Sequence, residues 1–392
     1  MGEFVLFLGI SLLLGTIISY YISRLNFPTI TGLILLGVIF NFLPFTNNLF
    51  KNYSFLFAFI VEIAPTILLF RTGVEFGFIR YPNKKILIAS IIQPIITFSI
   101  VFLLVEIIFN LHIFEALTIS TIWMVTGSDI AIIIIKQLKV NPETKIQLGI
   151  MTVFDDLIAE ICFFLFFPLL KFYSIHQGDT LLILKSSSLE VLFSIICGIV
   201  LGFLIKQFLE SSPIKHNKLI IYSSLILIIL GISEVLYLHA IIVALISGIV
   251  VGSTRKVNCA KDILKNLSEI DNVSYALFVI FAVASVEISG MWFYLFESVL
   301  ILLIRFLAKS ISTFFVEKLK LVSGIKALDI IVSLLPQSVL SIYFAYKIKD
   351  LLITSNASIF AITVISVIIF EVFGYVTIML TRMNRQRTLN GH

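Results

Sequence analysis

The chain has 392 residues, of which 59% are hydrophobic and only 13% are charged, and its formal net charge is +5. Its mean hydropathy of +1.11 lies far above the range of soluble globular domains. This composition excludes a soluble enzyme and predicts an all-α polytopic membrane protein. The positive charge does not indicate a nucleic-acid partner, because it is spread over short loops between apolar segments and no basic domain lies outside them.

Apolar runs long enough to cross a hydrocarbon core of roughly 30 Å recur along the whole chain. They predict about thirteen transmembrane helices, at residues 3–23, 28–44, 53–72, 85–110, 114–135, 147–171, 188–208, 218–237, 239–254, 273–289, 291–317, 326–346 and 358–381. Residues 3–23 lack a basic start and a small-residue cleavage site, so they are interpreted as a first span and not as a signal peptide.

The basic residues predict the orientation of these helices, because lysine and arginine collect in cytoplasmic loops. Every loop after an odd-numbered span contains basic residues. The loops after even-numbered spans contain only Lys51, Lys171, Lys185, Lys347 and Lys349. This asymmetry predicts an N-terminus outside the cell and a C-terminus in the cytoplasm, with a short cytoplasmic tail at residues 383–392.

The sixth predicted span contains three acidic residues in the sequence FDDLIAE. A charge at the centre of a spanning helix costs about 2.5–3.5 kcal/mol, so such residues are seldom kept without a use. Asp155 and Asp156 point about 100° apart on a helix, whereas Glu160 follows Asp156 by one turn on the same face. The sequence therefore predicts two aspartates with separate tasks, and Glu160 is a further candidate.

The membrane depth of other polar residues matches that of the aspartates. At about 1.5 Å of rise per residue from the nearest cytoplasmic lysine, Asp155 and Pro336 are roughly 15 Å deep, Lys309 roughly 13 Å and Asp129 roughly 10 Å. Arg305 lies deeper, at roughly 19 Å. Features from four different spans thus meet in one layer near the middle of the bilayer.

Two spans are predicted to be interrupted at this depth. The fifth contains Thr126, Gly127, Ser128 and Asp129, and the twelfth contains Pro336, Gln337 and Ser338. Proline removes a backbone donor, and small polar side chains compete for helical hydrogen bonds. If spans 1–6 and 8–13 are two repeats, the interruptions occupy matching positions, which is typical of a transporter's binding site.

Other classes of site have less support. Cys162, Cys197 and Cys259 form no metal-binding pattern, the histidines never pair at ligand spacing, and no Ser/His/Asp grouping indicates an enzyme. A cation channel would not need a lysine paired with a buried carboxylate. A transporter of organic anions would need positive helix ends free of Asp129.

Several segments resemble those of bacterial monovalent cation:proton antiporters, a family that includes sodium/proton antiporters and potassium efflux proteins. SDIA and FDDLIAEI are the more specific matches. The similar segments are FPTITGLILLGVIF, LLFRTGVEFGFIR, ISEVLYLHAIIVALISGIVVGS and FEVFGYVTIMLTRMN, so the resemblance runs from about residue 24 to 385.

The resemblance implies a role for each candidate residue. Asp156 would bind Na⁺ or a proton, and Asp155 would pair with Lys309, with Arg305 as the alternative partner. Ser128 and Asp129 stand where the family carries a Thr-Asp pair, next to Thr126. The segment LLPQSVLS lacks the glycine expected at the second crossing, which leaves the roles of Pro336 and Gln337 open.

The resemblance also implies the function and the assembly. We expect electrogenic exchange of Na⁺ or Li⁺ for protons by alternating access, with K⁺/H⁺ or electroneutral exchange as alternatives and with no cofactor. A homodimer in the bacterial inner membrane is expected. The implied parts are a scaffold and dimerisation domain at 1–84 and 218–290, a transport core at 85–171 and 291–382, and a connecting helix at 172–217.

Overall fold

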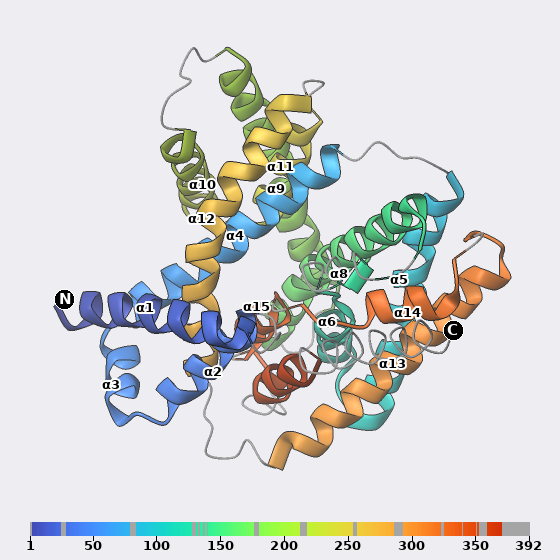
Figure 1. Ribbon diagram of the computed structural model, residues 1–392, viewed down its shortest axis with the longest axis horizontal. Coiled ribbons are helices and arrows are strands. Elements are labelled where there is room, and N and C mark those ends of the chain that lie inside the picture. Colours follow the sequence, from blue (N-terminus) through green and yellow to red (C-terminus); the bar gives the residue numbers. More distant parts are fainter. Residues whose placement is uncertain are drawn as a thin grey trace, which may run out of the picture. The chain divides into compact units, whose positions relative to one another are not determined.

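The computed structural model of the chain describes residues 2–24, 29–78, 84–127, 131, 134–135, 138, 140–175, 180–211, 218–253, 257–285, 293–322, 325–338, 340–349, 351–352 and 359–370. Almost all of these residues are helical (Figure 1). The helices are α1 (Gly2–Arg24), α2 (Thr29–Asn41), α3 (Pro44–Asn52), α4 (Ser54–Phe78), α5 (Lys84–Phe109), α6 (Ile113–Met124), α8 (Pro142–Ile175), α9 (Thr180–Ser211), α10 (Lys218–Val235), α11 (Ala240–Gly252), α12 (Val257–Ala284), α13 (Leu295–Lys318), α14 (Ala327–Leu334), α15 (Leu340–Ile348) and Ile359–Phe370.

The predicted class, an all-α polytopic membrane protein with two interrupted helices, is confirmed. Among the described residues, seven helices are long and apolar enough to cross a bilayer. The fifth and twelfth predicted spans are each broken: α6 ends at Met124, and α14 and α15 are separated by residues 335–339. The final predicted span is described only at Ile359–Phe370.

Two helices differ from the predicted spans. Helix α3 lies between the second and third predicted spans and overlaps the second only at Pro44, because PFTNNLFKN is too short and polar to cross a membrane. Helix α12 begins at Val257, well before residue 273, because its first half is amphipathic. Charged residues lower the mean hydropathy of this half, so its sequence does not resemble a transmembrane span. Ile263 and Leu267 on its apolar side are nevertheless fully buried.

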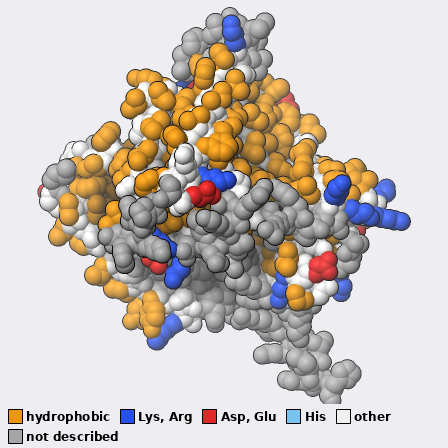
Figure 2. Space-filling model, turned by 90° about the horizontal axis from the view of Figure 1, so that it is seen from above, with side chains coloured by type: hydrophobic (Ala, Val, Ile, Leu, Met, Phe, Trp, Pro, Cys, Tyr) orange, Lys and Arg blue, Asp and Glu red, His pale blue; other side chains and the backbone are white. Residues whose placement is uncertain are grey.

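The exposed faces of the long helices are apolar, as expected for contact with lipid. On α9, Phe203 and Leu204 are more than half exposed, and on α13, Leu303 and Phe314 are too. Hydrophobic side chains accordingly cover most of the described surface in Figure 2. Because exposing such side chains to water is unfavourable, this surface belongs in the hydrocarbon core of a bilayer.

The chain divides into two compact units. The first comprises Met1–Gly15, Leu43–Arg80 and Phe164–Ser285. Within it, α11 packs against α4 and α9, and α12 packs against α4. Glycines allow the close approach of α4 and α11, since a Cβ atom on Gly73 or Gly248 would overlap the backbone of the facing helix.

The second unit comprises Thr16–Phe42, Tyr81–Phe163 and Val286–His392, and it contains both interrupted helices. Helix α5 packs against α6 and α13, α14 packs against α13, and α15 packs against α6 (Figure 1). The assignment of a scaffold and a transport core to particular residue ranges stays a prediction. All of the polar contacts described below lie within the second unit.

Candidate functional site

The two interrupted helices meet where each loses its helical hydrogen bonds. Thr126 and Gln337 form an isolated antiparallel bridge between extended segments. The Gly127 N–H donates to the Pro336 carbonyl over 2.9 Å, and the Ser338 N–H donates to the Val125 carbonyl over 3.4 Å. Each break thus supplies hydrogen-bond partners for backbone groups that the other break leaves unpaired. Such pairing is required inside a membrane, where water cannot satisfy these groups.

Gly127 is required at the crossing because the two backbones lie so close together. A Cβ atom at this position would lie 2.9 Å from the Gln337 carbonyl oxygen. Gln337 itself is held by its side chain, because the Ser366 hydroxyl donates to its Oε1 atom over 3.0 Å. The crossing is therefore a closely packed structural element.

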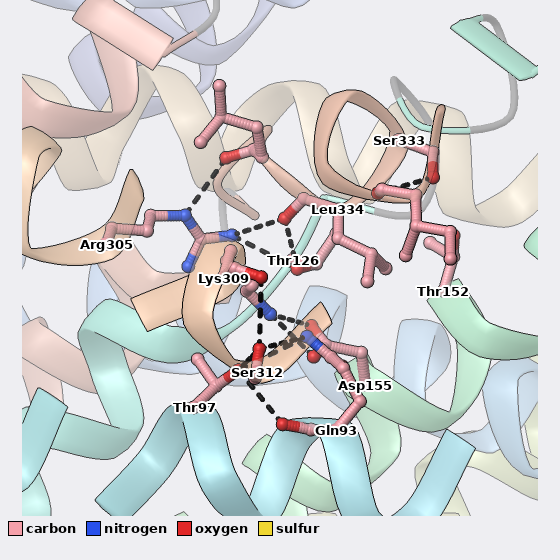
Figure 3. A network of polar contacts seen from close by, with 12 residues as sticks. Gln93, Thr97, Thr126, Thr152, Asp155, Arg305, Lys309, Ser312, Ser333 and Leu334 are labelled. Carbon is pink, nitrogen blue, oxygen red and sulfur yellow. Dashed lines mark hydrogen bonds and ion pairs between the residues drawn. The ribbon is translucent and has the colours of Figure 1, made fainter. Parts of the chain in front are cut away.

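Arg305 of α13 joins the ends of both half-helices (Figure 3). Its guanidinium donates to the carbonyl of Trp123 in the last turn of α6 over 2.8 Å and to the Thr126 hydroxyl over 3.1 Å. It also donates to the carbonyls at the end of α14, those of Leu334, Leu335 and Pro336, over 2.9–3.3 Å. The side chain is fully buried. The cation thus lies at two negative helix C-termini.

Lys309, one turn further along α13, forms an ion pair with Asp155 of α8. The Lys309 Nζ atom lies 2.5 Å from Oδ1 and 2.6 Å from Oδ2 of the carboxylate. Both side chains are 0% exposed. Of the two basic residues considered as partners of Asp155, Lys309 makes the contact in the structure and Arg305 binds the helix ends.

Asp156 and Glu160 lie on α8 beside this pair. Asp156 is 6% exposed and Glu160 is 1% exposed. The Oε2 atom of Glu160 has no hydrogen-bond partner among the described residues. Thr152, one turn before Asp156, is also fully buried and completes a polar stripe on this helix.

The buried charges of this region are nearly balanced. With every group ionised, Arg305 and Lys309 face Asp155, Asp156 and Glu160, so these described residues leave one negative charge uncompensated. One proton or one monovalent cation restores neutrality, and buried charge without compensation is strongly unfavourable. The described residues contain no group of three or more His, Cys, Asp or Glu side chains that could hold a metal ion in the usual manner.

The predicted site residues divide into three groups. The structure brings Asp155 and Lys309 together, and it brings Thr126, Pro336 and Gln337 to the crossing with Arg305. Asp156 and Glu160 lie on the helix that carries Asp155. Ser128 and Asp129 lie outside the described residues.

Sequence reasoning missed three polar residues next to Lys309. Gln93 and Thr97 of α5 form hydrogen bonds with Ser312, which lies one turn after Lys309 on α13. The signal was present in the sequence, because Gln93 and Pro94 interrupt an otherwise apolar run and Ser312 follows the intramembrane lysine at i+3.

Comparisons with known proteins cover almost the whole chain. The family model described as the transmembrane sodium/hydrogen exchanger matches residues 9–382. A pairwise search of curated protein sequences finds no match.

The fold is similar to that of solved antiporter structures. The sodium proton antiporter MjNhaP1 from Methanocaldococcus jannaschii at pH 8 superimposes with a TM-score of 0.72 and 18% identity, covering 95% of each chain. An electron-microscopy structure of the same antiporter gives a TM-score of 0.62 with 16% identity, covering 97% of this chain and 95% of that one.

Proposed function

Because the chain belongs to the sodium/hydrogen exchanger family, we propose that it exchanges Na⁺ or Li⁺ for protons and that this exchange is electrogenic. The chain is a multi-pass membrane transporter and not an enzyme. The observation that carries the proposal is the fully buried Asp155–Lys309 ion pair directly beside Asp156. In this arrangement Asp156 and Lys309 can each release a proton when a cation binds.

In the proposal, Asp156 is the residue for which the cation and a proton compete. A carboxylate is a suitable ligand for a hard monovalent cation, and it binds the cation only when deprotonated. Competition for one carboxylate is sufficient to couple the two fluxes. Thr152 and Glu160 lie one turn before and one turn after Asp156 on α8, and in the proposal they support it.

Lys309 supplies the second proton. When the cation binds, the Asp155–Lys309 pair opens and the buried lysine, which loses its counter-charge, releases its proton. The proton-loaded site, with neutral Asp156 and charged Lys309, then carries one more positive charge than the cation-loaded site. Two protons move against one cation, so each cycle moves one net charge, equivalent to about 2.3 kcal/mol at 100 mV.

The crossing keeps this site in place. Arg305 neutralises the negative helix ends, and Asp129 is proposed to do the same for the positive ends. Alternating access would come from movement of the core against the scaffold. We further propose a homodimer in the bacterial inner membrane with the N-terminus outside.

Potassium/proton exchange and electroneutral exchange are the alternatives. The Asp-Asp sequence favours the electrogenic sodium branch, because the family resemblance associates a glutamine before the aspartate with potassium efflux and an asparagine with electroneutral exchange. Neither of those residues occurs at position 155.

The test is proton flux in proteoliposomes, followed with a pH-sensitive dye while Na⁺, Li⁺ and K⁺ are added in turn. The membrane potential is clamped in one series and free in the other. We expect a response to Na⁺ and Li⁺ whose rate depends on the clamped potential. A response to K⁺ alone, or one indifferent to potential, would contradict the proposal.

A further inference from the structure

A cluster of three polar side chains lies one helical turn from Lys309. The Gln93 Nε2 atom lies 3.1 Å from Ser312 Oγ and 3.2 Å from Thr97 Oγ1, and the two hydroxyl oxygens are 2.8 Å apart. All three side chains are 0% exposed. In Figure 3 the side chains of Gln93 and Thr97 point from α5 toward Ser312 and the Asp155–Lys309 pair.

The direction of these hydrogen bonds follows from the number of donors. The Ser312 hydroxyl donates to the backbone carbonyl of Lys309 over 3.1 Å, and the Thr97 hydroxyl donates to Ser312. With both hydroxyl protons used in these bonds, the Thr97 oxygen accepts from the NH₂ group of Gln93, and the Ser312 oxygen can accept from this group as well as from Thr97. This orientation of the Gln93 amide gives both of its N–H groups a hydroxyl acceptor, whereas the reverse orientation would turn these two donors away from the hydroxyl oxygens.

This orientation leaves the amide oxygen of Gln93 without a hydrogen bond. The Oε1 atom is buried and has no partner among the described residues. A buried acceptor of this kind is unfavourable, and its presence in a transporter suggests a partner in another state of the cycle. Lys309 is a buried side chain with N–H groups to offer, and it lies one turn before Ser312 on α13.

We propose that the Gln93 amide oxygen accepts a hydrogen bond from Lys309 when a bound cation displaces the lysine from Asp155. Gln93 is then a positioning residue that holds Lys309 for its return. This inference rests on the proposed function, in which the Asp155–Lys309 pair opens in each cycle. It assigns the amide oxygen of Gln93 a role in setting cation affinity.

The consequence for cation binding has a definite sign. Without the amide oxygen, the displaced lysine has no acceptor, so the cation-loaded state loses a hydrogen bond. The cation-free state meanwhile loses its unsatisfied acceptor. Both changes favour the cation-free state, and they raise the KM for the cation without changing the rate at saturation.

The test compares Gln93→Met with Thr97→Val in proteoliposomes. Methionine keeps the shape of glutamine but has no amide oxygen, and the expected result is a KM for Na⁺ about 10-fold higher with a maximal rate within about twofold of the wild type. Thr97→Val removes the two hydrogen bonds that the Thr97 hydroxyl makes with Gln93 and Ser312 and leaves the amide oxygen in place. Its KM should stay within about twofold of the wild type.

Two results would overturn the inference. One is an unchanged KM in Gln93→Met, with or without a loss of maximal rate, and the other is an equal rise of the KM in Thr97→Val. If Gln93→Met does not fold, Gln93→Asn withdraws the oxygen by one methylene and should raise the KM in the same way. A wild-type protein without cation-driven proton flux would instead contradict the proposed function itself.

Discussion

Asp155 and Asp156 are neighbours in the sequence, but they have different surroundings in the structure. Asp155 is held by Lys309 through both of its carboxylate oxygens, whereas Asp156 lies on the face of α8 that also carries Thr152 and Glu160. This difference follows from the helix, since adjacent residues point about 100° apart. One aspartate is thus paired with a lysine, and the other is the proposed exchange carboxylate.

The first prediction concerns Asp156. Asp156→Asn removes the charge and the titratable group but keeps the size of the side chain, so proton flux driven by Na⁺ should fall at least about 100-fold, as expected when a charged contact of about 3 kcal/mol is lost. Flux in proteoliposomes measures the effect, and size-exclusion chromatography checks the fold. Undiminished flux in a folded variant would exclude Asp156 as the exchange carboxylate.

The second prediction concerns Lys309. Lys309→Met should reduce the voltage dependence of exchange more than cation affinity, because the charge on the lysine side chain can no longer change during the cycle. The substitution also leaves Asp155 buried without its partner, which should lower stability by about 3–5 kcal/mol. The double variant Asp155→Asn/Lys309→Met removes both charges and should melt at a higher temperature than the single variant. Voltage dependence that disappears in Arg305→Ala but persists in Lys309→Met would contradict the assignment.

The sequence was sufficient to predict the charged pair of Asp155 and Lys309, but not the neutral backbone groups that bind Arg305. Counting residues from the nearest lysine that was predicted to be cytoplasmic was enough to place Asp155 and Lys309 at one depth, because helical rise is constant. The partners of Arg305 could not be predicted in this way, since most are backbone carbonyls and every residue has one. The cost of leaving those carbonyls unpaired at membrane depth becomes visible only after the crossing is built.

At the level of helices, Arg305 is the common contact of the two half-helix ends. Five hydrogen bonds link its guanidinium to α6, α14 and the segments that follow them. A lysine has the same charge but only three donors at a single nitrogen, so it cannot reach both ends.

The third prediction follows from this geometry. Arg305→Lys should lower stability by about 2–4 kcal/mol, as expected for the loss of several buried hydrogen bonds, and should slow exchange at least about 10-fold. Thermal unfolding in detergent and proteoliposome flux measure the two effects. Wild-type stability in Arg305→Lys would show that charge alone is sufficient at the crossing.

Close helix packing in the first unit gives the fourth prediction. A Cβ atom on Gly248 of α11 would overlap the Phe70 carbonyl of α4, so Gly248→Ala should force the helices apart and cost about 1–3 kcal/mol or more. Gly231 of α10 has no heavy atom within 4 Å of the corresponding position, so Gly231→Ala is the matched control. It should be neutral or stabilise the helix by about 0.5–1 kcal/mol. Equal melting temperatures for both variants would argue against the packing.

The interrupted helices show why some elements were predictable and others were not. Thr126–Gly127 and Pro336–Gln337 combine helix breakers with apolar flanks, so both breaks can be located from the sequence. The bridge between Thr126 and Gln337 could not be predicted, because the pairing of residues in a bridge depends on how two distant segments meet. The early start of α12 was missed for a different reason, since an amphipathic helix has no hydropathy signal.

At the level of the whole molecule, the number of protons displaced by each cation determines how transport responds to pH and to voltage. Binding equilibria of the two ligands are linked, so each displaced proton changes the cation affinity by a factor of ten per pH unit. Voltage dependence reports the same number independently, because only unequal charges in the two directions make exchange electrogenic.

The fifth prediction uses this linkage. Protons compete with the cation, so the KM for Na⁺ should fall as pH rises and become constant once the cation-free protein has lost the competing protons. If both Asp156 and Lys309 release a proton, a plot of log KM against pH should approach a slope of −2 in the acidic range. In the double variant Asp155→Asn/Lys309→Met only the Asp156 proton remains, and the slope should approach −1. Flux measured at several pH values with the potential clamped gives both slopes. Equal slopes of −1 in the wild type and the variant would mean that Lys309 keeps its proton throughout the cycle, and the ion pair with Asp155 would then be a structural contact.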